Sequence, residues 1–303
     1  MKSVMLGDCL HYASPYMRGV ADASHRLGIA HYEVSIRQPL ELLGKVLDSV
    51  KPDLIWTHML LWPPAGSPEV AELVALMERE ARRGTRIVIH DGDCKAPTRH
   101  PHDLSAWCSL ALVNHAHDRS AWKVPVLRWP YFAAYQERIA DPDPAWRCQL
   151  FFAGSLGADA VYAARTRLIE GLRSRGVILR TPTALDGNTL AKTPAIAASA
   201  DAVLGFGRPD APGWLDTRVF QYPGAGGILL HDDVGGYLEP WVHFVPYRSG
   251  NPDSVLETLG RLARMPAAGR QALRTTAFAH VQRHHNSIAR VKQVLAELEL
   301  PCA

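Results

Sequence analysis

The residues with the clearest potential for chemistry lie between positions 216 and 230. Arg218 and Gln221 are three positions apart, which places them on one face of a predicted short helix. Glycines follow at 224, 226 and 227, and glycine permits positive φ angles and close approach of the backbone to a ligand. An apolar run at 228–230 then predicts an interior strand. The segment could bring an arginine and bare backbone to a phosphate, although a glycine-rich connection is also a common helix end.

Further candidates follow apolar runs in the same half of the chain. Gly154 and Ser155 come after the run at 148–153, Arg208 comes after the run at 202–206, and Arg165 lies on the helix predicted between them. N–H groups at a glycine turn that leads into a helix bind phosphate, and an arginine can add two parallel hydrogen bonds. We therefore predict a diphosphate site formed by Gly154, Ser155, Arg165, Arg208, Arg218, Gln221, Gly226 and Gly227.

Candidates for a general base lie in the first half of the chain. His90, Asp91 and Asp93 follow the fourth predicted strand, and His11 follows the first. A carboxylate or imidazole can take a proton from an acceptor hydroxyl within hydrogen-bond reach, so Asp91, Asp93 and His11 are the predicted catalytic residues. The two aspartates also fit a turn closed by their own side chains, or a metal motif, but two carboxylates specify little and we predict no metal site. Several tryptophans could stack on an acceptor ring or belong to the core: Trp56, Trp62, Trp107, Trp122 and Trp129.

The elements that must position these residues alternate along the whole chain. Short apolar runs are followed by helix-length amphipathic runs, which predicts parallel sheets with helices on both faces. Two prolines within 141–144 mark a linker. We predict an α/β protein of two Rossmann-like domains that face each other across a cleft, with domains at 1–143 and 144–282 and a C-terminal helix at 283–303 that crosses back to the first domain.

Composition limits the choice of function. A chain of 303 residues is long enough for two domains, and a net charge of +3 does not demand a polyanionic partner. The five cysteines are scattered, and no apolar window is long enough to span a membrane, so we expect a cytoplasmic protein. Neither Gly-x-Gly-x-x-Gly after a first strand nor a P-loop is present, which argues against nicotinamide dehydrogenases and P-loop enzymes.

The motifs resemble those of one enzyme family. Arg218-Val-Phe-Gln221 followed by Ala225-Gly-Gly-Ile-Leu-Leu230 resembles the Arg-x-Phe-Glu and Cys-Gly-Gly motif of the spore-maturation-type (CgeB-like) glycosyltransferases, which have the GT-B architecture. The strand with Gly154-Ser155, the helix with Arg165 and a histidine-containing terminal helix also compare, over about residues 148–298. The family has a glutamate where this chain has Gln221, which leaves the identity of the donor open.

The resemblance implies a glycosyltransferase that moves a sugar from a nucleotide diphosphate sugar to a hydroxyl acceptor. It implies that residues 144–282 bind the donor, a UDP-sugar by default, and that residues 1–143 bind the acceptor, with no cofactor and no metal. Three alternatives stay open. The acceptor could be a hydroxymethylated base in phage-type DNA, the enzyme could be a nucleotide-sugar epimerase, or the chain could be a two-lobed ligand-binding protein.

Overall fold

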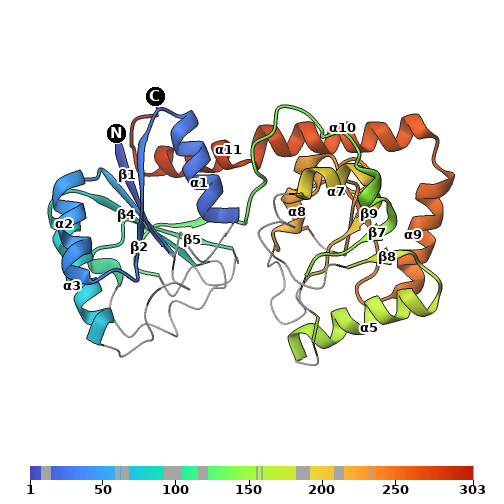
Figure 1. Ribbon diagram of the computed structural model, residues 1–303, viewed down its shortest axis with the longest axis horizontal. Helices are drawn as coiled ribbons and strands as arrows, with labels where there is room; N and C mark the ends of the chain where they lie inside the picture. Colours follow the sequence, from blue (N-terminus) through green and yellow to red (C-terminus); the bar gives the residue numbers. More distant parts are fainter. Residues whose placement is uncertain are drawn as a thin grey trace. The chain divides into compact units, whose positions relative to one another are not determined.

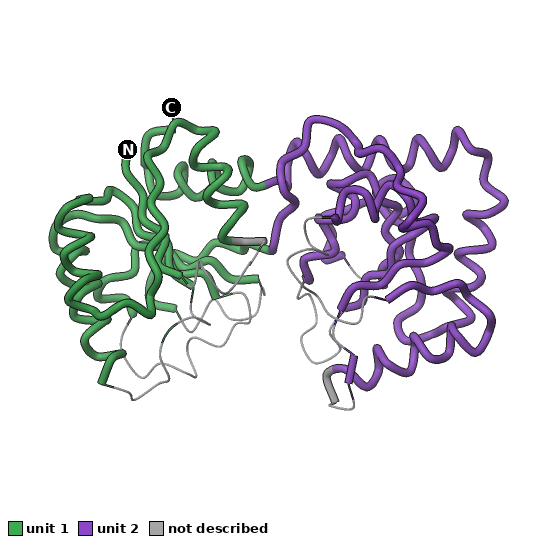
Figure 2. Tube along the Cα trace, viewed as in Figure 1, with its two compact units in different colours: residues 1–130, 287–303 green, residues 131–286 purple. Residues whose placement is uncertain are grey.

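The chain forms two compact units. A computed structural model describes residues 1–7, 15–58, 62, 68–91, 104–114, 122–154, 156–157, 160–181, 192–207, 215–232 and 234–302. Unit 1 contains residues 1–130 and 287–303, and unit 2 contains residues 131–286 (Figure 2). The sequence prediction had divided the chain after residues 143 and 282.

Unit 1 is built on a parallel sheet. Within the described residues the sheet has six strands in the order β2-β1-β3-β4-β5-β6, so the chain runs outward in opposite directions from the β1/β3 pair (Figure 1). The strands are β1 (Lys2–Gly7), β2 (Ala30–Ser35), β3 (Leu54–His58), β4 (Arg86–Asp91), β5 (Leu110–Val113) and β6 (Val126–Arg128).

Helices cover both faces of this sheet. Helices α2 (Leu40–Val50) and α3 (Pro68–Arg82) share a hydrophobic cluster with one face of the sheet. Helix α1 (Pro15–Arg26) packs beside α11 (Ser287–Glu297) on the other side of the sheet (Figure 1). This arrangement is the doubly wound sheet that the alternating pattern predicts.

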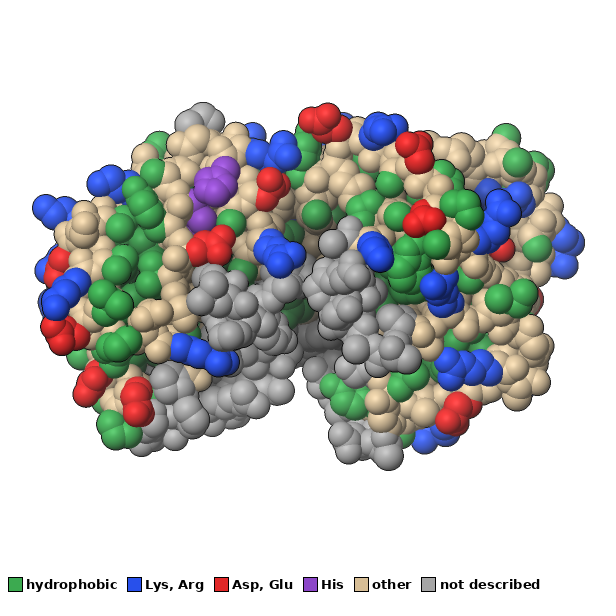
Figure 3. All heavy atoms as spheres, in the orientation of Figure 1, with side chains coloured by type: hydrophobic (Ala, Val, Ile, Leu, Met, Phe, Trp, Pro, Cys, Tyr) green, Lys and Arg blue, Asp and Glu red, His purple; other side chains and the backbone are tan. Residues whose placement is uncertain are grey.

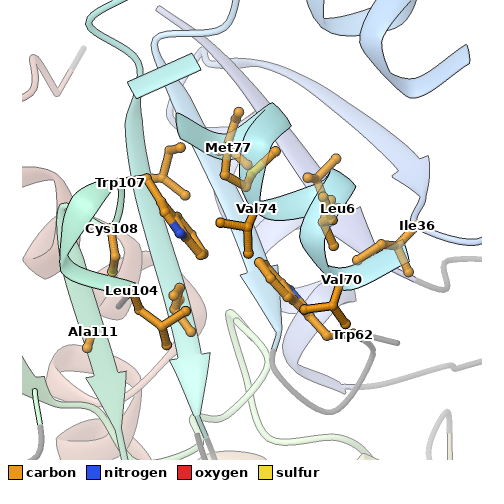
Figure 4. Close-up of a cluster of buried hydrophobic side chains, with 14 of the residues drawn as sticks. Leu6, Ile36, Trp62, Val70, Val74, Met77, Leu104, Trp107, Cys108 and Ala111 are labelled. Atoms are coloured by element: carbon orange, nitrogen blue, oxygen red, sulfur yellow. The ribbon is translucent and has the colours of Figure 1, made fainter. Parts of the chain in front are cut away.

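The tryptophans of unit 1 belong to its core. In the cluster under α3, the rings of Trp62 and Trp107 stack with centroids 5.3 Å apart (Figure 4). On the opposite face Trp56 stacks with Trp129 at 6.3 Å, and Trp122 is also buried. The core alternative for these five residues is therefore confirmed, since none presents its ring to solvent.

Unit 2 repeats the same topology. Its described strands are all parallel and lie in the order β11-β10-β9-β7-β8, which is again an order in which the chain runs outward from a central pair, here β7 and β9 (Figure 1). The strands are β7 (Cys148–Phe151), β8 (Leu179–Arg180), β9 (Ala200–Leu204), β10 (Leu229–His231) and β11 (Val245–Pro246). The predicted α/β class with two parallel sheets is confirmed.

Helices also pack on both faces of the unit 2 sheet. Helices α5 (Ala160–Ser174) and α9 (Pro252–Arg264) share a hydrophobic cluster with one face. Helix α7 (Thr193–Ser199) and the short helix η5 (Pro223–Ala225) cover the other. Two more short helices, η2 (Leu104–Ala106) in unit 1 and η4 (Pro144–Trp146) in unit 2, complete the connections together with α8 (Arg218–Gln221).

The chain returns to unit 1 after its last helix in unit 2. Helix α10 (Ala267–His284) belongs to unit 2, and α11 begins only three residues later in unit 1. In unit 1, Trp129 donates its indole N–H to the carbonyl of Arg290 on α11, at 3.3 Å. None of the helices found among the described residues is both long enough and apolar enough to cross a membrane.

Candidate functional site

The strand order of the unit 2 sheet reverses between β7 and β9. The two strands are parallel neighbours, with Phe151 opposite Val203. The connection after β7 leads to β8 on one side, whereas the connection after β9 leads to β10 on the other. Ligands of doubly wound sheets bind where the strand order reverses in this way, because the connecting loops separate and leave a crevice. The residues that follow these two strands are therefore the first candidates for a site.

Arg165 from α5 lies at this reversal point. Its guanidinium carbon is 5.8 Å from the ring centre of Phe152, which follows β7, and 5.8 Å from that of Phe206, which follows β9. The ring of Tyr162 lies at 5.5 Å. Only 6% of Arg165 is exposed, so a full positive charge is held among aromatic rings at the end of the sheet.

Arg218 reaches the same edge from α8. Its Nε donates to Oδ2 of Asp216 at 2.7 Å, Nη2 forms an ion pair with the same oxygen, and Nη1 donates to the carbonyl of Ala153. Its guanidinium carbon also lies 5.4 Å from the ring of Phe152. The side chain thus joins the start of α8 to the backbone beyond β7, while the partly buried Gln221 ends α8.

Gly154 lies directly under this arginine. A Cβ atom at this position would be 2.5 Å from Nη1 of Arg218 and 2.7 Å from Cζ of Phe152, so no other residue fits without displacing them. The sequence prediction selected Gly154 as a ligand-binding residue, and the structure adds a packing reason for it. Ser155 and Arg208, predicted for the same site, lie outside the described residues.

The glycine-rich turn after α8 is packed within unit 2. The N–H groups of Gly226 and Gly227 donate to carbonyls of the preceding turn, at 2.9 and 2.7 Å. Gly226 has a φ of +83°, and a Cβ atom there would lie 2.5 Å from Ile139. Arg274 from α10 binds the carbonyl of Gly226 at 2.8 Å. Close packing gives a structural reason for Gly226, and the predicted role of Gly226 and Gly227 in ligand binding stays a prediction.

Acidic groups share this edge of the sheet. Burial, followed by the carboxylates of Asp232 and Asp216, raises the pKa of Tyr247 well above its usual value, while the guanidinium groups of Arg218 and Arg165 oppose this shift. Two arginines and two aspartates therefore lie within electrostatic range of the Tyr247 phenol, and of these Asp216 and Arg218 are in direct contact.

The sequence analysis did not select either aspartate. Asp216 accepts the backbone N–H of Arg218 at 2.7 Å, which is the local turn that an aspartate two residues before a helix start favours. Asp232 directly follows β10 and accepts the N–H of Gly207 at 2.7 Å. The partner of Asp216 is only two residues away, so this contact could have been considered from the sequence, whereas the partner of Asp232 follows another strand.

In unit 1 the described base candidate is buried. Asp91 is the last residue of β4 and is 1% exposed. His90 precedes it on the other face of the sheet, 4.7 Å from the ring of His58, and burial lowers the pKa of His90 well below its usual value. Asp93 and His11 lie outside the described residues. Where the structure is described, no three or more His, Cys, Asp or Glu side chains are arranged to hold a metal ion.

The fold and the position of the site define a class of protein. The chain has two α/β units, each built on a sheet of parallel strands whose order reverses at a central pair, and this is the GT-B fold. This confirms the GT-B architecture expected from the sequence, and solved structures of glycosyltransferases match the chain over nearly its whole length.

Comparison with solved structures gives particular relatives. HepE from Anabaena, solved with UDP and glucose, matches with a TM-score of 0.63 and 11% identity, over 99% of each chain. A DNA-modifying β-glucosyltransferase, solved with and without uridine diphosphoglucose, matches with a TM-score of 0.62 and 9% identity, over 99% of this chain and 100% of that chain. A glycosyltransferase from Rickettsia africae matches with a TM-score of 0.61 and 8% identity, over 98% of each chain.

A family model supports the same class from the sequence side. Residues 185–296 match a family described as glycosyl transferase-like, and this stretch includes Arg218 and Gln221. No curated protein matches the chain. The match to a glycosyl transferase-like family and the GT-B fold together support the prediction of a glycosyltransferase.

Proposed function

We propose that unit 2 binds the diphosphate of a nucleotide sugar at the carboxyl ends of β7 and β9, and that the enzyme transfers the sugar to a hydroxyl acceptor. The position of Arg165 carries this proposal, because its guanidinium lies between the residues that follow the two central strands. UDP is the proposed nucleotide, in line with the UDP and uridine diphosphoglucose in the titles of structures with the same fold.

In the proposed reaction this site stabilises the negative charge of the departing diphosphate. When the bond between the sugar and the diphosphate breaks, negative charge develops on the departing phosphate, and a guanidinium fixed in a poorly hydrated site stabilises that charge strongly. Backbone N–H groups near Gly154 and the N-terminal end of α5 would add to it. These groups can do what a divalent cation does elsewhere, so we propose a reaction without a metal or other cofactor.

We further propose that Gln221 contacts the ribose of the donor and that the chain is a member of the CgeB-like family. Gln221 ends α8 at the position where the spore-maturation-type family has a glutamate, and an amide can both donate and accept hydrogen bonds to ribose hydroxyls. The shared motif at residues 218–230 supports membership of that CgeB-like family.

The acceptor side is proposed for unit 1. A base must take the acceptor proton, and Asp91, Asp93 and His11 lie at or after the ends of strands of the unit 1 sheet.

We also propose a cytoplasmic location. The described cysteines are free thiols, and burial raises the pKa of the Cys108 thiol to about 12, as suits a reduced structural residue.

A hydroxymethylated base in DNA is the second candidate acceptor. The match to a DNA-modifying glucosyltransferase favours it, since that enzyme shares the fold over the whole chain. Among the described side chains on the face shown in Figure 3, however, Lys and Arg are scattered between acidic and apolar residues and form no basic stripe. Transfer to hydroxymethylated duplex DNA that falls steeply with salt would favour DNA, and activity indifferent to salt would favour a small acceptor.

The first experiment measures nucleotide binding by titration calorimetry with UDP, GDP, dTDP and uridine. We expect UDP to bind and Arg165→Gln to weaken UDP at least about 10-fold, because a charge-assisted contact contributes about 1.5–3 kcal/mol, while uridine affinity stays the same. Arg167→Gln is the matched control, because Arg167 is exposed on the same helix. Equal loss in both variants, or no binding of any nucleotide diphosphate, would remove the proposed donor site.

A further inference from the structure

We propose that Asp216 and Arg218 position the donor site and do not themselves bind the diphosphate. The Asp216–Arg218 pair fixes the backbone at the end of β7 and the ring of Phe152, and so keeps Arg165 in place. The effect of the pair on UDP binding rests on the nucleotide-sugar site proposed above. Its effect on the backbone at the end of β7 concerns the protein without ligand.

The hydrogen bonds of Arg218 carry the first step. Each of its three guanidinium nitrogens has a partner within the chain: Nε and Nη2 bind Asp216, and Nη1 binds the carbonyl of Ala153. Only 8% of the residue is exposed. These contacts use three of the five guanidinium N–H groups, and the burial of the residue restricts the access of a diphosphate to the others. Displacing one of the partners would leave a buried carbonyl or carboxylate without its donor, which is costly.

The charge of the pair carries the second step. Asp216 is buried beside Arg218, so the two together have no net charge. An anion that approached Arg218 would meet the carboxylate as well, and repulsion at short range in a poorly hydrated site is strong. The rings of Phe152, Tyr162 and Phe206 lie around Arg165.

Phe152 and Gly154 connect the pair to the ligand site. The guanidinium carbons of Arg218 and Arg165 lie 5.4 and 5.8 Å from the centre of the same Phe152 ring. Gly154 leaves the space that Nη1 of Arg218 occupies against the backbone. Releasing Arg218 would therefore free both the loop after β7 and one wall of the aromatic cage around Arg165.

Asp216→Asn distinguishes direct binding of the diphosphate from positioning, because the two roles predict opposite changes in UDP affinity. The asparagine keeps an oxygen for the N–H of Arg218 but cannot accept from the guanidinium. If Arg218 bound the diphosphate directly, removing the adjacent negative charge would leave UDP binding unchanged or tighter. A positioning role predicts that the Kd for UDP rises at least 10-fold. Asp201→Asn, which removes one exposed carboxylate from β9, should leave it unchanged.

Amide hydrogen exchange in the free protein tests the mechanical part without nucleotide. We expect Asp216→Asn to raise exchange at least 10-fold in a peptide covering residues 150–157, with no change in a peptide covering β9. Arg218→Lys should do the same, because lysine keeps the charge but cannot bind Asp216 and Ala153 together. It serves as the second variant should Asp216→Asn fold poorly.

The UDP-binding and hydrogen-exchange measurements test different parts of the proposal. Exchange that stays at the wild-type level in both variants, or UDP binding to Asp216→Asn that is as tight as in wild type, overturns the positioning role. If wild-type protein binds no UDP, the donor-site proposal fails, and the exchange measurement still decides whether the Asp216–Arg218 pair holds the end of β7.

Discussion

Single residues at the end of β7 show how closely side chains and backbone fit in unit 2. Gly154 could be selected from the sequence because glycines after strands often approach ligands. Its packing reason could not be predicted, since it depends on Arg218, which is 64 positions further along the chain. The same limit applies to Asp232, because its partner Gly207 follows a different strand and is 25 positions away.

The close fit at Gly154 gives a residue-scale prediction. Gly154→Ala places a methyl group against Arg218 and Phe152, and we expect it to lower the free energy of unfolding of unit 2 by about 1–3 kcal/mol, as overpacking does. The measurement is urea unfolding followed by circular dichroism.

Gly260→Ala is the matched control for this prediction. Gly260 lies inside α9, and the nearest atom to a Cβ there is 3.4 Å away, at the flexible end of Arg264. Alanine in a helix interior should raise stability by about 0.5–1 kcal/mol. A Gly154→Ala variant that gained stability like the control would contradict the described packing.

At the scale of elements, the alternating pattern located most strands and helices within a few residues. The strand predicted at 202–206 is instead β9 at Ala200–Leu204. The apolar run continues to Phe206, but that ring packs against Arg165 beyond the end of the strand, so the run does not mark the strand's limits. The glycine turn was a second ambiguity, because sequence alone cannot separate packing from ligand approach.

Helix α11 yields an element-scale prediction. Its residues Val291, Val294 and Leu295 are fully buried in unit 1. We expect Leu295→Ala to destabilise unit 1 by about 2–5 kcal/mol, because a buried leucine side chain is replaced by a cavity. Hydrogen exchange should rise in peptides from β1 and α1 and stay unchanged in peptides from β7. Lys292→Ala, on the exposed side of the same helix, should change neither. Faster exchange confined to unit 2 would contradict the assignment of α11.

At the scale of the whole molecule, histidines with lowered pKa values occur in both units. Burial, with a smaller effect of His25, lowers the pKa of His31 in unit 1 to about 4. Burial also lowers the pKa of His90 in unit 1 and of His243 and His280 in unit 2. Acid therefore acts on both units through the same kind of group.

The histidines predict a loss of stability in acid. Between pH 6.5 and about 4 the unfolded chain binds a proton at His31 that the folded chain does not bind, so stability is complete above pH 6.5 and falls as the pH decreases. His31 alone should contribute up to about 3 kcal/mol to this loss. The check is urea unfolding at pH 7.5, 6, 5 and 4.5. His31→Asn, which keeps a polar group that can hydrogen-bond to the hydroxyl of Ser3, should flatten the profile. An unchanged slope would contradict this assignment.

The return of the last helix to unit 1 has a consequence for biosynthesis. A ribosome releases residues 1–130 long before residues 287–303, yet both stretches form unit 1. While unit 2 is being translated, α1 and the sheet of unit 1 lack the contacts that α11 later makes. Unit 1 can therefore be completed only after residues 287–303 have left the ribosome, and a nascent chain stalled before that point should be a target for chaperones.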